Sequence, residues 1–173
     1  STSGGVVQLA KALVSSWSRT QKTVALSSAE SEYYAIVSGI CEATLVQTIV
    51  EEICGRRLHI CVFSDSAAAL ASGERLGIQR MKHMDIRFLF VKELVDAGVV
   101  SLKKVHTTAN VADMLTKEAT PDGIRNCLSL LGCVDMSQWR LAMNSDAIQA
   151  DGTSVQHGTR WQRHVQYTTV SGT

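Results

Sequence analysis

The stretch LSSAESEYYAIV, residues 26–37, begins the longest regular pattern in the chain. Ser27 and Glu30 have the spacing of a capping box, in which each side chain binds the other residue's backbone amide at the start of a helix. Apolar residues then recur at helical spacing as far as Gly55, a residue type well suited to the position after a helix. The pattern predicts a helix over this whole interval. Because Glu30 fills the capping role, Glu32 needs another explanation.

Shorter segments on both sides of this helix alternate between strand and helix patterns. Runs with β-branched and aromatic residues and without proline indicate strands, and apolar residues at three- and four-residue spacing indicate helices. The result is an α/β fold with a mixed sheet. The expected elements are, in chain order, strands at 4–14 and 16–26, the helix that follows them, a strand at 57–63, helices at 66–73 and 81–97, a strand at 99–106, a loop at 107–110, and a last helical segment that Pro121 interrupts and that ends near Gly132.

The composition suits one globular core. The chain has 173 residues, of which 45% are hydrophobic, and its net charge of +1 gives no global field that would indicate a nucleic-acid or membrane partner. The five cysteines are odd in number and lie mostly in apolar segments, so we expect reduced core thiols rather than a zinc site or disulfides. No secretory segment and no apolar run near membrane length is evident, which favours an intracellular protein.

The chain divides at about residue 132. Residues 133–173 are rich in Ser, Thr, Gln and Gly and keep no period, so we expect a loosely ordered tail. Within it, residues 161–170 have a weak strand pattern. The chain begins without methionine and inside patterned sequence, which suggests a fragment of a longer protein.

Three acidic residues occupy special positions in the predicted fold. Glu32 lies in the first turns of the long helix, Asp65 at the carboxyl end of a buried strand, and Asp113 at the start of the last helical segment. Sites in open α/β sheets form beyond the carboxyl ends of strands, and carboxylates that converge there attract hard cations such as Mg²⁺. Each residue also has a structural explanation: Glu32 as an electrostatic helix cap, Asp65 as an N-cap, and Asp113 as the i,i+4 partner of Lys117.

Four segments of the chain resemble those of a known protein family. They occur in one order and spacing that closely resemble the ribonuclease H domain of copia-type LTR retrotransposon polyproteins, and the likeness extends over about residues 1–132. The segments are SSAESEYYAI (27–36), VFSDSAAAL (62–70), KHMDIRFLFVKELV (82–95) and VHTTANVADMLTK (105–117).

The resemblance implies a ribonuclease H-like fold that hydrolyses the RNA strand of RNA/DNA hybrids with Mg²⁺, or alternatively Mn²⁺. Such sites use two ions about 3.5–4 Å apart, one activating water and one stabilising the leaving oxygen. By position, Glu32 and Asp65 are implied as ligands of one ion and Asp113 as the ligand of the water-activating ion. His106 is implied in proton transfer or product release, with a polar loop residue as the alternative.

The resemblance also implies partners. Lys82, His83 and Lys104 are candidate contacts to nucleic acid, although a packing role is favoured for Lys82 and His83. The expected partners are an RNA/DNA hybrid and the reverse transcriptase part of the same polyprotein, without a membrane or a small-molecule cofactor. The expected location is the cytoplasm, a retroelement particle or the nucleus.

The match lacks one part of the family pattern. The family's first strand, central in its sheet, carries a further aspartate that bridges both metal ions, but residues 1–29 contain no Asp or Glu. We therefore expect a mixed sheet that lacks its first, central strand, and unpaired backbone groups on both neighbouring strands. A less favoured arrangement has residues 161–170 in the gap, with Asp146 or Asp151 lending a carboxylate.

Two functions remain open at this point. In the first, the chain is a ribonuclease H domain that is active only within a longer polyprotein. In the second, it is a catalytically dead retrotransposon remnant that at most binds nucleic acid through backbone phosphates, in a salt-dependent manner that is indifferent to sequence.

Overall fold

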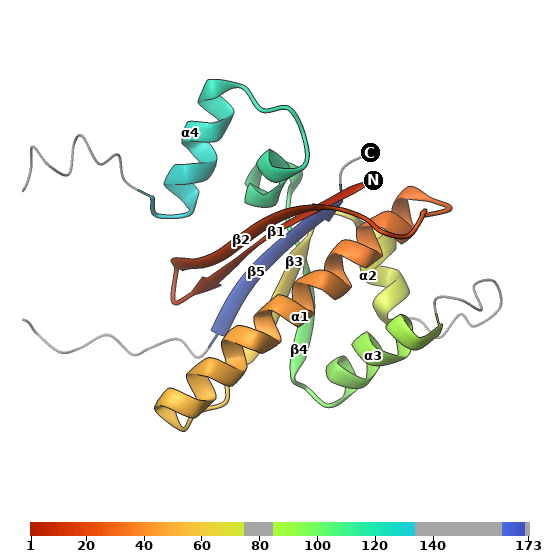
Figure 1. Cartoon of the computed structure of the whole chain (residues 1–173), viewed down its shortest axis with the longest axis vertical. Helices are drawn as coiled ribbons and strands as arrows, with labels where there is room; N and C mark the ends of the chain where they lie inside the picture. The colour runs from red at the N-terminus through yellow and green to blue at the C-terminus, as the bar shows by residue number, and fades with distance from the viewer. Residues whose placement is uncertain (75–84, 134–163, 172–173) are drawn as a thin grey trace, which may run out of the picture.

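The computed structural model describes residues 1–74, 85–133 and 164–171, whose strands form one mixed sheet in the order β2-β1-β5-β3-β4. Helices α1, α2 and α3 cover one face of this sheet, whereas η2 and α4 lie against the other (Figure 1). The predicted α/β class and mixed sheet are confirmed. The elements are β1 Thr2–Leu9, β2 Ala12–Thr20, α1 Ser28–Cys54, β3 His59–Ser64, α2 Ala67–Glu74, α3 Asp85–Asp96, β4 Val100–Lys104, η1 Thr107–Ala109, η2 Val111–Leu115, α4 Pro121–Leu130 and β5 His164–Ser171.

The hairpin β1–β2 turns earlier than the sequence indicates. Its two turn residues, Ala10 and Lys11, have φ values of 50° and 72°. Positive φ at both central positions is the geometry of a type I′ hairpin turn, in which Gly, Asn and Asp are the usual residues. Because the turn contains none of these three residue types, the sequence gives no sign of it. The expected strand boundaries at 14 and 26 were therefore wrong, and the strands end at Leu9 and Thr20.

Helix α1 follows the prediction closely. Ser27 is its N-cap, with its hydroxyl oxygen accepting a hydrogen bond from the Glu30 amide at 3.1 Å, and Gly55 ends the helix in the left-handed conformation. The Glu30 carboxylate accepts from the amide of Leu26 at 2.7 Å and from the Tyr34 hydroxyl at 2.6 Å. By length and composition alone α1 could cross a membrane, but half of its apolar window is buried within the protein, as in the core helix of a folded domain.

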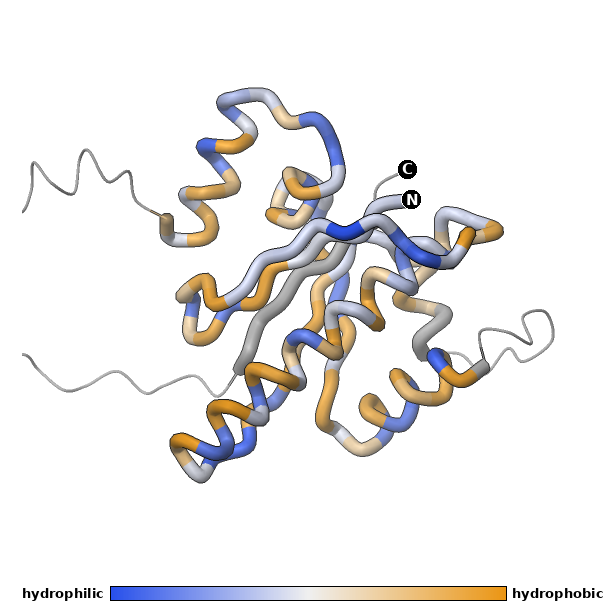
Figure 2. Tube along the Cα trace, in the orientation of Figure 1, coloured by the Kyte–Doolittle hydropathy of each residue, from blue (hydrophilic) through white to orange (hydrophobic). Residues whose placement is uncertain are grey.

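The two faces of the sheet carry separate apolar clusters. On β1, Val7 packs into the large cluster under α1, and Val6 packs on the opposite face with Val111 and Leu131. Both valines are fully buried, because successive strand residues point to opposite faces and both faces are covered. Hydrophobic residues recur along α1 and α3 between hydrophilic ones, which fits helices with one buried side (Figure 2).

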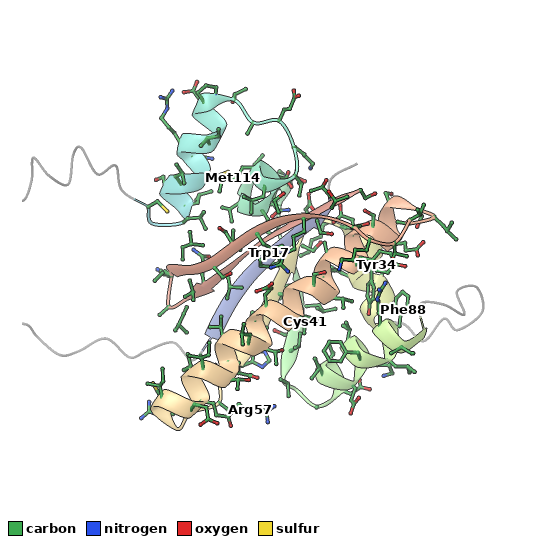
Figure 3. All side chains as sticks on the ribbon, in the orientation of Figure 1. Trp17, Tyr34, Cys41, Arg57, Phe88 and Met114 are labelled. Carbon is green, nitrogen blue, oxygen red and sulfur yellow. The ribbon has the colours of Figure 1, made fainter. Side chains whose placement is uncertain are left out.

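Helix α3 packs on the start of α1 through aromatic side chains. The rings of Tyr33 and Phe88 stack with their centroids 4.1 Å apart, and the Arg87 guanidinium lies 4.5 Å from the centre of the Tyr34 ring. Tyr34 and Phe88 lie between the two helices, whereas Met114 lies on the far side of the sheet near α4 (Figure 3). Arg87 of the KHMDIR segment therefore contacts the start of α1, whereas Ile86 of the same segment is 82% exposed.

The carboxyl-terminal elements differ from the expected helical segment with an interruption at Pro121. Residues 107–110, expected as a loop, include the 3₁₀ turn η1, and Asp113 lies on the short 3₁₀ helix η2. Pro121 starts α4 instead of interrupting a helix, because proline fits the first turn, where its missing N–H would be unpaired anyway. Thr120 caps this helix by accepting from the Gly123 amide at 3.2 Å.

Strand β5 fills the gap that we expected in the sheet. It pairs antiparallel with β1, from Ser3 opposite Ser171 to Leu9 opposite Val165, and parallel with β3. The expectation of a sheet without a central strand is therefore wrong, and the strand of the less favoured arrangement is found, at His164–Ser171. The reason is physical: two neighbouring strands with unpaired backbone groups accept any extended segment within reach. The rest of the tail, residues 134–163 and 172–173, lies outside the described residues.

Candidate functional site

Asp65 stands where β3 leaves the sheet. The turn is fixed by Ser64, whose hydroxyl accepts from the Ser66 amide at 3.2 Å, and by Ser66, whose hydroxyl accepts from the Ala69 amide at 3.2 Å. Ser66 thus caps α2, so the alternative that Asp65 is the N-cap is wrong. Half-buried Asp65 is left at the edge of the sheet, where β3, β4 and β5 all end because they run in parallel.

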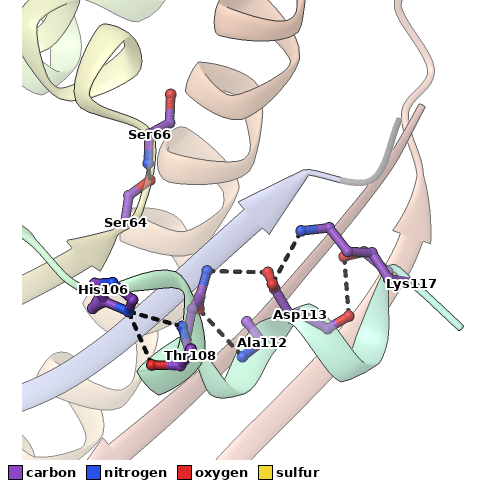
Figure 4. Close-up of polar contacts among 9 residues, drawn as sticks. Ser64, Ser66, His106, Thr108, Ala112, Asp113 and Lys117 are labelled. Carbon is purple, nitrogen blue, oxygen red and sulfur yellow. Dashed lines mark hydrogen bonds and ion pairs between the residues drawn. The ribbon is translucent and has the colours of Figure 1, made fainter. Parts of the chain in front are cut away.

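Asp113 is held at this edge by η2. Its carboxylate accepts from the Asn110 side-chain amide at 3.2 Å through Oδ1, and its Oδ2 lies 3.0 Å from Lys117 Nζ (Figure 4). Element η2 is itself tied to the sheet, since the Ser18 hydroxyl of β2 donates to the Leu115 carbonyl at 2.6 Å. The predicted i,i+4 pairing of Asp113 with Lys117 is confirmed.

Close packing against β1 also fixes the height of η2 above the sheet. A Cβ atom added to Gly4 would lie 2.7 Å from Thr116 Cγ2 and 2.9 Å from Leu115 Cβ. Only a glycine leaves room for such an approach. The carboxylate of Asp113 is therefore positioned by the backbone of β1 as well as by its own hydrogen bonds.

The charges at this edge influence one another. Burial raises the pKa of Asp113, the hydrogen bond and charge of Lys117 lower it, and the charge of Asp65 raises it further, with a net increase. Burial alone would lower the pKa of Lys117, but Asp113, then Asp65, then Glu32 raise it overall. All three predicted acidic residues therefore act on a single ammonium group, although they come from α1, the end of β3 and η2.

Glu30 and Glu32, two positions apart on α1, occupy different surroundings. Glu30 is 2% exposed and its carboxylate is engaged by Leu26 and Tyr34, so its role is structural. Glu32 is half-buried and contributes to the field at Lys117. The structural role of Glu30 at the helix start is confirmed, but its carboxylate binds the amide of Leu26, whereas the capping box predicts that of Ser27.

The remaining candidates are placed in part. His106 is exposed; its Nδ1 lies 2.9 Å from the Thr108 hydroxyl and caps η1 through the Thr108 amide. Lys104 is exposed at the end of β4, beside Ser64 in the parallel register. Lys82 and His83 lie outside the described residues, as do Asp146 and Asp151.

The carboxylates do not form a complete metal site. Oxygen ligands of this kind suit Mg²⁺ or Mn²⁺. Yet in the described parts of the chain, no three His, Cys, Asp or Glu side chains lie close enough together to hold a metal ion. Lys117 contacts Asp113 directly, and β5, with the sequence HVQYTTVS, brings no acidic residue to this edge. The donor set therefore falls short of a two-metal centre.

Two features of the site were missed from the sequence. Lys117 was considered only as a surface partner of Asp113, and Asn110 was not considered at all. Asn110 is 2% exposed and caps η2 by accepting from the Ala112 amide at 3.4 Å. An asparagine directly before an apolar-acidic VADML segment is a capping signal that could have been used.

Comparison with known proteins finds similarity to retroelement polyproteins. It is 34% identical over 119 residues to the retrovirus-related Pol polyprotein from transposon TNT 1-94 of Nicotiana tabacum, a match that covers 68% of this chain. It is 29% identical over 135 residues to the corresponding polyprotein from transposon RE1 of Arabidopsis thaliana, covering 76% of the chain. The polyprotein from transposon RE2 of the same plant is 26% identical over 136 residues, covering 78%.

These similarities are distant and partial. The chain spans about 9% of the length of each of these relatives. No protein-family profile matches the chain, and no solved structure does. The chain is thus similar to a small part of copia-type retrotransposon Pol polyproteins.

Proposed function

We propose that residues 1–132 are a ribonuclease H-like domain of a copia-type Pol polyprotein, completed here by β5, which binds RNA/DNA hybrids and cleaves them poorly. The similarity to Pol polyproteins gives the context. The strand order around β5, with an antiparallel partner on one side and a parallel partner on the other, suits the fold that the sequence resemblance implies.

One observation carries the proposal. Asp65, Asp113 and Glu32 come from three elements that are distant in sequence, yet all three act on the same ammonium group at one edge of the sheet. Three carboxylates that gather at the carboxyl ends of parallel strands are costly unless a function requires them, since like charges repel in a half-buried place.

Poor cleavage follows from the incomplete donor set. When bound, a divalent ion would supply an activated water and stabilise developing charge on phosphate oxygens. Asp65, Glu32 and Asp113 are the residues that would hold it, but their present arrangement offers no group of three close ligands in the described residues. The chain's own contribution is therefore to bind and orient a hybrid.

The end of the sheet at which Asp65 and Asp113 lie, with Glu32 on α1, is called the acidic edge. The expected binding surface lies beside it. Lys103 and Lys104 are exposed at the end of β4, and His106 follows them on the same edge. Contacts from such side chains to phosphates release counterions, so binding weakens as salt increases, with a slope of roughly 0.9 per phosphate neutralised. We propose an intracellular setting, with the reverse transcriptase region of the same polyprotein as the natural neighbour.

The test is cleavage and binding of a labelled RNA/DNA hybrid by the full chain, first in Mg²⁺ and then in Mn²⁺, with Asp65→Asn as the control. We expect salt-dependent binding and only slow cleavage. Cleavage that disappears in Asp65→Asn would show that three carboxylates suffice. Absence of hybrid binding at low salt would contradict the proposal and leave a remnant without nucleic-acid function.

A further inference from the structure

The starting point is the position of Lys117 relative to Asp113. The two side chains are paired at 3.0 Å, and the Lys117 amide donates to the Asp113 carbonyl at 3.0 Å, which fixes the lysine one turn beyond the aspartate. The Lys117 side chain is 46% exposed and that of Asp113 is 21% exposed. The pair therefore lies at the rim of the acidic edge, with the aspartate on its inner side.

Both oxygens of the Asp113 carboxylate are engaged. Oδ2 contacts the ammonium of Lys117, and Oδ1 accepts from the Asn110 amide. A divalent ion bound through Asp113 needs one of these oxygens at about 2.0–2.6 Å. It must therefore displace Lys117 or Asn110, and displacing Lys117 brings two cationic groups together.

Lys117 also differs from the other paired lysine in the described residues that has the same spacing. Lys92 contacts Asp96 at i,i+4 on the exposed side of α3. Lys117 instead contacts Asp113 at the edge of the sheet, and the charges of Asp65 and Glu32 raise its pKa in addition to that of its direct partner. The ammonium group of Lys117, paired with Asp113 at 3.0 Å, supplies at this carboxylate the positive charge that a metal ion supplies in a carboxylate site.

We propose that Lys117 is a built-in counter-cation of the acidic edge, which holds Asp113 in place of a divalent ion and competes with such ions for it. This role of Lys117 explains why three candidate metal ligands are present although they do not form a complete metal site. The lysine compensates the repulsion among the carboxylates, so the folded chain needs no metal for stability. The treatment of Glu32, Asp65 and Asp113 as one site rests on the proposed function. The competition between Lys117 and a divalent ion for Asp113 does not require nuclease activity.

The test measures Mn²⁺ binding to the full chain by electron paramagnetic resonance, without nucleic acid. Lys117→Gln should bind Mn²⁺ about tenfold more tightly than the unchanged chain, since one competing positive charge is removed. Lys117→Arg, which keeps the charge, should bind Mn²⁺ as the unchanged chain does. The same variants, melted with and without Mn²⁺, should show a metal-dependent rise in Tm for Lys117→Gln alone.

Lys92→Gln is the matched control, because it removes an equal charge from a pair of equal spacing outside the acidic edge. An unchanged Mn²⁺ affinity in Lys117→Gln would overturn the proposal, as would an equal gain in Lys92→Gln. A gain in Lys117→Gln that is lost again in Lys117→Gln/Asp113→Asn would locate the competition at Asp113. Because no hybrid is present, a failed cleavage or hybrid-binding assay leaves this result standing.

Discussion

Strands β3 and β5 lie side by side and parallel in the centre of the sheet, but they contribute differently. β3 belongs to the segment that is similar to Pol polyproteins and ends directly before Asp65, whereas β5 comes from about a hundred positions later and contains no acidic residue. Both satisfy the backbone of their neighbours. A sheet is completed by any strand of suitable length and direction, whereas a site requires a particular side chain at a particular height on that strand.

The largest effect should come from removing β5. A chain that ends at residue 163 leaves the facing backbone groups of β1 and β3 without partners, and each buried unpaired group costs about 1–3 kcal/mol. Because total stabilities are about 5–15 kcal/mol, we expect the cooperative unfolding transition in urea to be lost. Circular dichroism during urea titration measures this directly.

A chain that ends at residue 171 is the control, since it keeps the whole strand. It should unfold with the midpoint of the full chain. If the chain that ends at residue 163 also kept that midpoint, β5 would add nothing to the sheet, and the backbone equivalence of β3 and β5 would be refuted.

The same contrast explains what the sequence could predict. Helix α1 and its Ser27 cap, the strand before Asp65 and the order of elements all follow from local patterns. The hairpin turn at Ala10–Lys11 did not, because its positive φ values have no Gly or Asn to announce them. Nor did the position of β5, because strand pairing across the sheet depends on which backbone groups lack partners, and no local pattern records this.

The acidic residues show the same limit. Sequence placed Asp65 and Asp113 at the same edge of the sheet, because strand ends and helix starts meet there. The sequence could not predict how far Asp113 lies from the sheet, because this distance depends on how closely η2 packs on Gly4. The same close packing of η2 on β1 sets the position of Lys117, whose pKa the charges of Asp113, Asp65 and Glu32 raise.

A smaller effect, on Mn²⁺ affinity, should follow from placing an aspartate near the end of β5, as Asp65 follows the end of β3. Val170 pairs with Gly4, and continuing the register of Phe63 with Thr168 for two more residues would bring Val170 opposite Asp65, just beyond the end of β3. Val170→Asp should therefore add a carboxylate beside Asp65. We expect Mn²⁺ affinity to increase about tenfold, equivalent to about 1.4 kcal/mol, in an electron paramagnetic resonance titration.

Val170→Asn separates charge from shape in this experiment, because it has nearly the same size and no negative charge. It should bind Mn²⁺ as the unchanged chain does. If Val170→Asp gained no affinity although its urea midpoint showed an intact fold, the equivalence of height between β3 and β5 would be wrong, and completion of the sheet could not be extended to completion of the site.

The smallest effect concerns the start of α1 and asks whether stability and metal binding separate there as well. Ser27→Ala removes the hydroxyl that accepts from the Glu30 amide and should cost about 1 kcal/mol of unfolding free energy. Ser28→Ala, at the neighbouring exposed position, should cost less than about 0.5 kcal/mol.

In the Val170→Asp background both changes should leave Mn²⁺ affinity unaltered, because Ser27 supports the helix and contacts no carboxylate of the acidic edge among its described bonds. A fall in Mn²⁺ affinity that accompanies the loss of the cap would mean that the first turn of α1 sets the position of Glu32, and that fold and site are coupled at this helix although they are separable at β5.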